Sequence, residues 1–339
     1  MTDQTEVAMA SVVATAIRAP SMHNTQPWRF RVSLPEQDQI QGAVIEIWSD
    51  PSRRLPVADP TGWATRVACG AAALGAKLGV VLLGHRVDLS VLPQGVRQPR
   101  SDQPELVARL TVGTTHPATP QERELHHAIF RRRSNRYPFN ETPAAPDVPG
   151  KLMAAARAEG AWLDVLDKPR QRAAVAGLVR QGQHRLAADP SYRAEFTEWV
   201  REASADRISP HAGDDSHAPQ DGLLALRDVD AAARVSDRDF EPNPLVCVLG
   251  ADTDRPMAQV RTGAALLRVL LAGTAIGLES SMLSQPIEVP ELRRLLRAPL
   301  GRSVGWPQMV LRFGYGVRPP AAPRRPVSEV LKITSKAVA

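Results

Sequence analysis

Two short stretches of this sequence gather side chains that could bind a ligand. The first is PSMHNTQP, residues 20–27, in which serine, histidine, asparagine, threonine and glutamine lie between two prolines. Their side chains, with the free backbone N–H groups of a turn, could donate and accept hydrogen bonds around a flat heteroaromatic ring. An ordinary turn, whose side chains satisfy their own backbone, fits the same residues. This stretch alone leaves both interpretations open.

The second stretch is RRRSNRYPF, residues 131–139, with four arginines and a serine within six residues. Arginine forks bind phosphate oxygens in a bidentate manner, and Ser134 can add a hydrogen bond. A basic helix C-terminus that complements the helix dipole would explain two of these arginines but not four. The composition therefore predicts an anion site.

Three further stretches are weaker candidates. The double arginine of PRRPVSEV (323–330) would, by itself, be a solvated tail. LESSMLSQPIE (278–288) reads as a small, polar loop that could lie against a ligand or simply leave a helix. HAGDDSH (211–217) has metal-binding side chains, but a solvated acidic loop explains it better, so we predict no metal site.

Common signatures of other chemistries are absent from the sequence. There is no GxGxxG or GxxxxGK[ST] motif, no GxSxG elbow and no HExxH, which argues against dinucleotide-binding Rossmann, P-loop, hydrolase-elbow and zinc-protease sites. The only cysteines, Cys69 and Cys247, form neither a disulfide framework nor a metal motif. With no secretory signal recognised at the N-terminus, this favours a reducing, cytoplasmic location.

The charge of the chain does not indicate a nucleic-acid partner. The formal net charge is +6, but only five of the 42 basic residues are lysine, and most basic residues are scattered. No nucleic-acid-binding motif accompanies them. A membrane span is not predicted either, because the longest apolar stretch, residues 266–278, is interrupted by Arg268 and two glycines.

The elements that must position these stretches occur in the same order twice. Apolar periodicity predicts helices over residues 5–19, 65–84, 119–133 and 260–278, and strands over 28–34, 43–50, 105–113, 161–167, 244–251 and 308–316. Each half then has a helix, short strands, a buried helix of small residues and a late strand. The segments Gly70–Gly84 and Gly263–Gly277 look equivalent, which suggests an internal repeat.

This order predicts an α+β fold with two parts. We expect an N-terminal half over 1–118 and a C-terminal half over 119–339, with the proline-rich residues 141–150 as a connecting loop. Residues 185–240 fit neither half and are interpreted as an insertion, and SYRAEFTEWVREA within it predicts a helix.

Taken together, these stretches resemble the nitroreductase superfamily. RAPSMHNTQPWRF resembles its Pro-Ser-x-x-Asn-x-Gln-Pro-Trp signature, and RRRSNRYPF resembles its Arg-Arg-Ser-x-Arg flavin motif. PQMVLRFGYG, with PRRPVSEV, resembles its C-terminal strand and phosphate-binding arginine. The Pro-Ser motif comes first here, an order that resembles the Acg branch, whose chains are two nitroreductase-like halves fused in tandem. The resemblance covers nearly the whole chain and implies a pseudo-dimer of two small, mostly antiparallel sheets flanked by helices.

The resemblance also implies one FMN per chain, held between the halves. The implied cofactor-binding residues are Pro20, Ser21, Met22, His23, Asn24, Gln26, Arg132, Arg133, Ser134, Arg136, Ser284 and Gln285, with Arg324 or Arg325 on the phosphate. Ser284 and Gln285 stand near the place where the family has an acidic residue and a glycine, a pair this chain lacks. No catalytic side chain is assigned, because the chemistry would take place at flavin N5. Arg136 would favour negative charge on the ring.

Two functions remain open after the resemblance. One is an NAD(P)H-dependent oxidoreductase that reduces nitroaromatic or quinone-like acceptors. The other is an FMN-binding or sequestering protein whose insertion, residues 185–240, covers the flavin as a lid. Either would act as a monomeric pseudo-dimer or a weak homodimer, with small-molecule partners, no nucleic acid and no membrane.

Overall fold

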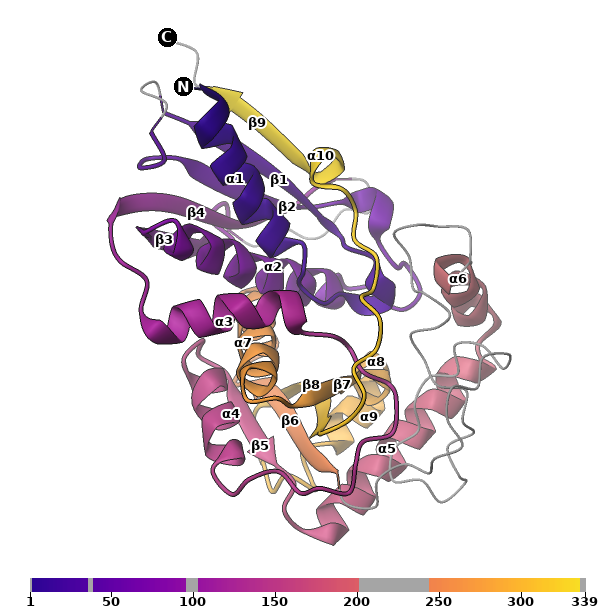
Figure 1. The fold of residues 1–339 in the computed structure, drawn as a ribbon. Helices are drawn as coiled ribbons and strands as arrows, with labels where there is room; N and C mark the ends of the chain where they lie inside the picture. The colour runs from indigo at the N-terminus through magenta and orange to yellow at the C-terminus, as the bar shows by residue number, and fades with distance from the viewer. Residues whose placement is uncertain (1, 36–38, 96–102, 201–243, 336–339) are drawn as a thin grey trace.

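The computed structural model describes residues 2–35, 39–95, 103–200 and 244–335 (Figure 1). Its helices are α1 (Thr2–Ala16), α2 (Trp63–Leu82), α3 (Pro120–Arg131), α4 (Val148–Arg157), α5 (Pro169–Ala188), α6 (Pro190–Val200), α7 (Pro256–Ala275), α8 (Gln285–Glu288), α9 (Pro290–Leu295) and α10 (Val327–Val330). Two 3₁₀ turns are η1 (Met22–Asn24) and η2 (Pro51–Arg53). The strands are β1 (Trp28–Leu34), β2 (Val44–Ser49), β3 (His85–Val91), β4 (Leu106–Thr115), β5 (Trp162–Val165), β6 (Leu245–Ala251), β7 (Glu279–Leu283), β8 (Trp306–Gly314) and β9 (Leu331–Ser335).

The strands form two separate sheets, so the fold is α+β, as expected from the sequence. The first sheet has the order β3-β4-β2-β1-β9 and the second the order β5-β6-β8-β7. All neighbours are antiparallel except β1 and β9, which pair in parallel from Phe30↔Leu331 onward. The last strand of the chain therefore completes the sheet that the first strand begins (Figure 1).

Local sequence explains several of these elements. Along β1 the residues alternate between buried and more exposed, the period-2 pattern of a strand with one face in the core. Helix α3 begins with a complete capping box, in which the Thr119 side chain and the Glu122 side chain satisfy each other's backbone N–H groups. Pro120 at the first turn is compatible with this start, because its missing N–H would have no helical partner there.

Helices α2 and α7 cross at glycines between the two sheets. A Cβ atom on Gly70 would lie 2.0 Å from the carbonyl oxygen of Val260, and one on Gly263 would lie 2.0 Å from that of Val67. The two contacts are equivalent. Adding 193 to the residue numbers of Gly70 and Val67 gives Gly263 and Val260, so each helix presents the same pair of positions to the other. Only glycine allows backbones to approach this closely.

The crossing makes each long helix part of both hydrophobic cores. The first core lies under the five-stranded sheet and includes Val260 and Leu271 of α7. The second lies under the four-stranded sheet and includes Trp63 and Val67 of α2. Among the described residues, α2 and α7 therefore connect the two cores.

Helix α2 is also the one helix, among the described residues, that is long and apolar enough to cross a membrane. Its apolar window is 89% buried inside the protein, which is the position of a core helix. The described residues thus give no separate evidence for a membrane span.

The structure corrects three expectations from the sequence. The expected loop at 278–288 is strand β7 followed by the short helix α8. The solvated tail expected at 323–330, if taken alone, instead ends in helix α10 and contains a buried Arg325. The expected connecting loop at 141–150 already contains the start of α4 at Val148. The acidic stretch at 211–217 lies outside the described residues.

Candidate functional site

The polar corner after α1 is a backbone turn of unusual conformation. His23, Asn24 and Gln26 all have positive φ, at 49°, 52° and 49°. Non-glycine residues rarely adopt this left-handed region, and clusters of such residues occur mainly at functional sites. The Ser21 hydroxyl accepts a hydrogen bond from the Gln26 N–H at 2.9 Å, which holds the turn closed.

The corner is bound to the C-terminal segment of the chain. The Asn24 side chain donates to the carbonyl oxygen of Pro323 and accepts from Arg324, each at 3.0 Å. The Gln26 side-chain oxygen accepts from the Arg325 N–H at 2.8 Å, and Gln26 is fully buried. Part of the corner's polar chemistry therefore joins the two ends of the chain.

Next to this corner, five arginines line a basic cavity of about 120 Å³, and one of them, Arg136, also lines the neighbouring apolar cavity. The other four are Arg18, just after α1, Arg132 and Arg133 after α3, and Arg324. Ser134 also lines the basic cavity, and its backbone bridges to Ser280 of β7. In the described part of the chain, none of the four arginines forms an ion pair with a carboxylate.

Burial and neighbouring positive charges lower the pKa of two of these arginines. Burial, and then the charge of Arg133, lower the pKa of Arg132 to about 10, although Glu279 opposes this. Burial and the charges of Arg132, Arg18 and Arg133 lower the pKa of Arg324 to about 9. The Nε atoms of Arg132 and Arg324 are buried and have no hydrogen-bond partner in the described part of the protein. Buried cations without counter-charge are costly, so the cluster is arranged for an anion.

Arg133 also has a structural role. Its Nη1 donates to the carbonyl oxygens of Phe130 and Arg132 at 2.9 and 2.8 Å, as a basic residue at a helix C-terminus does. Arg132 instead donates weakly to Ser134 and to the Arg18 carbonyl, at 3.3 and 3.4 Å. The two neighbouring arginines are therefore not equivalent.

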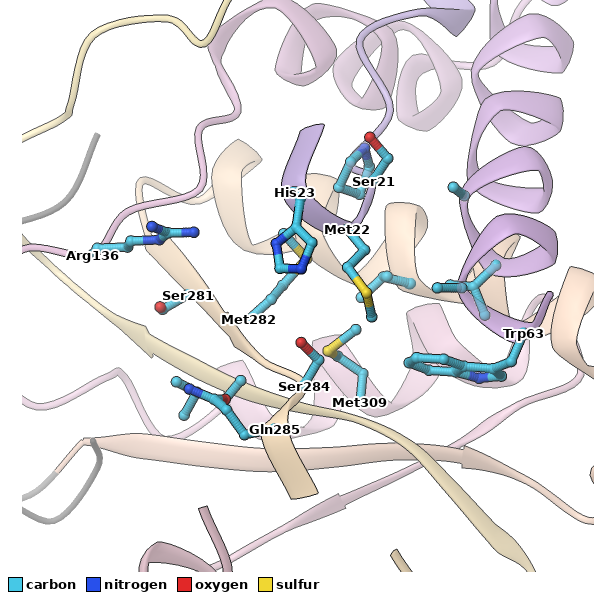
Figure 2. Close-up of a pocket in the computed structure, with 16 residues that line it drawn as sticks. Ser21, Met22, His23, Trp63, Arg136, Ser281, Met282, Ser284, Gln285 and Met309 are labelled. Atoms are coloured by element: carbon cyan, nitrogen blue, oxygen red, sulfur yellow. The ribbon is translucent and has the colours of Figure 1, made fainter. Parts of the chain in front are cut away.

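An apolar cavity of about 100 Å³ adjoins the basic cavity. Its walls come from the start of α2, from α7, and from β7 and β8, and Figure 2 shows Trp63 and Arg136 on opposite sides of it. The residues that line both cavities are Pro20, Ser21, His23, Arg136, Ser281 and Met282. Together the two cavities form one site with a charged end and an apolar end.

Trp63 is held in this wall by a buried polar network. Its indole N–H donates to the Gln308 side-chain oxygen, and Gln308 donates to Asp254 at 3.1 Å. Arg293 binds both carboxylate oxygens of Asp254, at 2.6 and 2.8 Å. A bidentate pair of this kind fixes geometry, so the indole is presented to the cavity in one orientation.

Helix α6 packs against His23 at the edge of the site. The Phe196 ring lies 5.0 Å from the His23 ring in an edge-to-face arrangement, and Tyr192 lies 6.3 Å away. The Tyr192 hydroxyl donates to Glu288 at 3.1 Å. The Glu195 carboxylate accepts from the N–H groups of Val57 and Ala58, both at 2.9 Å, and so fastens α6 to the first half. Most of the predicted 185–240 insertion lies outside the described residues.

The structure brings together most of the residues singled out in the sequence. Those that line the two cavities are Pro20, Ser21, Met22, His23, Asn24, Arg132, Arg133, Ser134, Arg136, Ser284, Gln285 and Arg324. Gln26 and Arg325 lie behind the cavity wall instead, and Arg325 pairs with Asp50 at 3.4 Å. The sequence prediction missed Arg18 and Trp63. Arg18 is two residues before Pro20, and its closeness to the polar stretch is the sequence signal that would have identified it.

Comparison with known proteins gives a family and several relatives. The model of the family described as "Nitroreductase family" matches residues 129–315. A Mycobacterium tuberculosis H37Rv protein provisionally named NAD(P)H nitroreductase Rv3131 is 31% identical over 337 residues, which cover 95% of this chain and 90% of the relative. The similarly named acg protein of the same strain is 28% identical and covers 96% of each chain.

Solved structures give weaker likenesses. A nitroreductase with bound FMN from Desulfitobacterium hafniense is 13% identical with a TM-score of 0.38, over 59% of this chain and 94% of that one. A BluB-like flavoprotein from Clostridium difficile is 16% identical with a TM-score of 0.39, over 61% of this chain and 96% of that one.

Proposed function

This chain belongs to the nitroreductase family, and we propose that it is an FMN-dependent oxidoreductase that uses NAD(P)H to reduce nitroaromatic or quinone-like acceptors. The provisional names of its relatives support the nicotinamide donor. The observation that carries the proposal is the cluster of Arg18, Arg132, Arg133 and Arg324, which has no carboxylate partner among the described residues, beside an apolar cavity. A molecule with a phosphate at one end and a flat ring at the other satisfies both ends.

The residues of the site fit FMN in this orientation. The uncompensated Nε atoms of Arg132 and Arg324 would donate to the phosphate, and Ser134 would add a hydroxyl. Met22, Met309 and Trp63 would pack on the ring and exclude water from it. Bound FMN would accept a hydride from NAD(P)H and pass electrons to the acceptor. The protein would contribute binding, orientation and electrostatics.

We further propose that the two sheets represent two fused halves. The reciprocal contacts of Gly70 and Gly263, with one offset of 193 residues, support this arrangement. The halves would meet near residue 119, where α3 begins, although β9 of the second half joins the first sheet. A fused pair of halves would act as a monomer or associate weakly.

We expect one non-covalent FMN per chain, because the arginine cluster is found on one side of the α2–α7 crossing. The measurement is the amount of flavin released by heat or acid from protein of known concentration, with FMN and FAD separated by chromatography. A ratio of two FMN per chain, or release of FAD, would contradict the proposed site.

A second candidate function is supported by the cover that α6 places over His23. If α6 keeps the nicotinamide away from the flavin, the protein would hold FMN without reducing acceptors. The hydrogen bonds from Val57 and Ala58 to Glu195 offer a test between the two functions. They hold α6 in place, and Glu195 itself lines neither cavity.

We expect Glu195→Ala to keep its FMN and to be reduced by NADPH or NADH several-fold faster than the parent. The substitution leaves two N–H groups without their acceptor and loosens the cover. The measurement is anaerobic stopped-flow bleaching of the flavin band. Glu195→Gln, which keeps one acceptor oxygen, is the control and should fall between the two.

The outcomes separate the two functions. Bleaching of the parent protein supports the oxidoreductase. Bleaching of Glu195→Ala alone supports a covered flavin-holding protein, and no bleaching of either, with FMN bound, refutes nicotinamide-dependent reduction.

A further inference from the structure

A third cavity lies at the α2–α7 crossing, away from the basic and apolar cavities. Its volume is about 360 Å³. It is lined by α2 and α7, by β3 and by the turn Ala158–Gly160 after α4. Nothing in the proposed flavin site uses the residues that line this cavity.

The third cavity corresponds to the apolar cavity by position in the fold. Three residues of α2 that line the apolar cavity, Ala64, Val67 and Ala68, become Met257, Val260 and Arg261 when 193 is added, and all three line the third cavity. Subtracting 193 from Leu266, Met282 and Ser284 gives Ala73, Leu89 and Val91, which line it as well. The same offset of 193 residues relates the glycines at the helix crossing. The apolar cavity and the third cavity therefore occupy equivalent positions on the two sides of the α2–α7 pair.

The chemistry of the third cavity differs from that of its counterpart. The turn Ala158–Gly160 takes the place of the polar corner at Ser21–His23, and no arginine other than Arg261 lines the cavity. Arg261 is exposed and has no hydrogen bond or ion pair in the described part of the chain. The carboxylate of Glu159 is neutralised, because Arg268 binds it at 2.6 Å. The cavity therefore offers one uncommitted positive charge.

The remaining walls favour a flat apolar body. Ala73, Val260 and Ala264 form a buried surface of small side chains, and Leu89 and Val91 face them from β3. Gly70 brings the backbone of α2 close, as its approach to Val260 shows. Binding of a ring would remove from water the ring itself and the partly buried Leu89 and Val91, and this burial is favourable in proportion to the apolar area removed. Without an arginine cluster, phosphate has no advantage over a single carboxylate.

We propose that the third cavity is a second ligand site that binds a planar aromatic carboxylate, with the ring between β3 and the two helices and the carboxylate on Arg261. The site is separate from the flavin site and does not depend on FMN for its walls. The site selects its ligand by the single positive charge of Arg261 and by a flat apolar wall that matches an aromatic ring.

The experiment is calorimetric titration of the FMN-loaded protein with 2-naphthoate, and with neutral 2-naphthamide for comparison. We expect one site for naphthoate, at least tenfold weaker binding of the amide, and no release of FMN. Arg261→Gln should weaken naphthoate binding at least tenfold and leave amide binding unchanged. Arg255→Gln is the matched control and should bind like the parent, because Arg255 is an exposed arginine at the N-cap of α7 that does not line the cavity.

A filling variant tests the position of the ring. Leu89→Trp places a larger side chain from the half-exposed strand β3 into the cavity and should abolish binding of both probes, with an unchanged melting temperature as the check on folding. If this variant does not fold, the Arg261→Gln comparison decides by itself. Displacement of FMN by naphthoate, equal binding to Arg261→Gln and the parent, or no binding at millimolar concentration would each overturn the proposal. If the parent protein does not hold FMN before the titration begins, that result counts against the flavin site alone, because flavin content is read separately.

Discussion

The double substitution Arg132→Gln, Arg324→Gln is expected to weaken FMN binding by about 100- to 10,000-fold. A hydrogen bond to a charged group contributes roughly 1.5–3 kcal/mol, and each factor of ten in affinity corresponds to about 1.4 kcal/mol. Arg132 is buried and Arg324 is half-buried beside the basic cavity, and the buried Nε atom of each lacks a partner in the described residues. The measurement is titration of the apoprotein with FMN by flavin fluorescence quenching.

The double variant should bind FMN more weakly, but its apoprotein should be no less stable than that of the parent. The pKa of each arginine is lowered in the folded protein, to about 10 and about 9, by burial and by the neighbouring guanidinium groups. A base whose folded pKa is lowered binds its proton less well in the folded state, so its charge opposes folding at neutral pH. Removal of the charges should leave the melting temperature of the apoprotein unchanged or raise it.

The neighbouring Arg325 provides the control. It is buried with Asp50 rather than in the cavity, so Arg325→Gln should destabilise the protein and change FMN affinity little. Unchanged FMN affinity in the double variant would mean that Arg132 and Arg324 do not contact the phosphate.

The substitution Gly263→Ala is expected to cost more than about 3 kcal/mol of folding free energy. Its Cβ would lie 2.0 Å from the Val67 carbonyl oxygen and 2.9 Å from the backbone nitrogen of Ala71. Because both neighbours are backbone atoms, no rotation of a side chain relieves the clash, and the two helices must separate. Ordinary overpacking of a core costs roughly 1–3 kcal/mol.

The measurement is the free energy of unfolding in denaturant, with the melting temperature as a second readout. Gly177→Ala in α5 is the matched control, because a Cβ there meets nothing within 4 Å. Alanine is favoured over glycine inside a helix by roughly 1 kcal/mol, so the control should be stabilised. If Gly263→Ala is as stable as the parent, the helices do not cross as closely as described.

The sequence was most informative where one pattern dominates. The alternating residues of β1 and the small apolar residues of α2 predicted those elements to within two residues at each end. Strand β7 was missed because Glu279, Ser280 and Ser281 are polar and yet buried. Their burial depends on partners far along the chain, such as Arg318, which pairs with Glu279 at 3.0 Å. No local pattern contains that information.

In the candidate site, too, residues within a local motif were predicted and residues that depend on distant partners were missed. The motif around Ser21 and the arginines after α3 predicted residues that the fold brings to one place. The choice between Arg324 and Arg325 was left open, because adjacent residues of an extended segment point in opposite directions and only the packing decides which faces the cavity. Trp63 was missed, because its role depends on a hydrogen-bond network from Gln308 to Arg293 that forms only in the folded chain.

The pairing of β9 with β1 has a consequence for synthesis on the ribosome. Gln26 and Arg325, which meet where the two ends of the chain come together, are 299 residues apart. At roughly 5–20 residues per second, β1 must wait on the order of 15–60 seconds for its parallel neighbour to be made. During that interval the edge of the first sheet has unpaired N–H and C=O groups, which favour pairing with other chains. Low temperature during expression, or a chaperone that shields this edge, should therefore raise the yield of correctly folded protein.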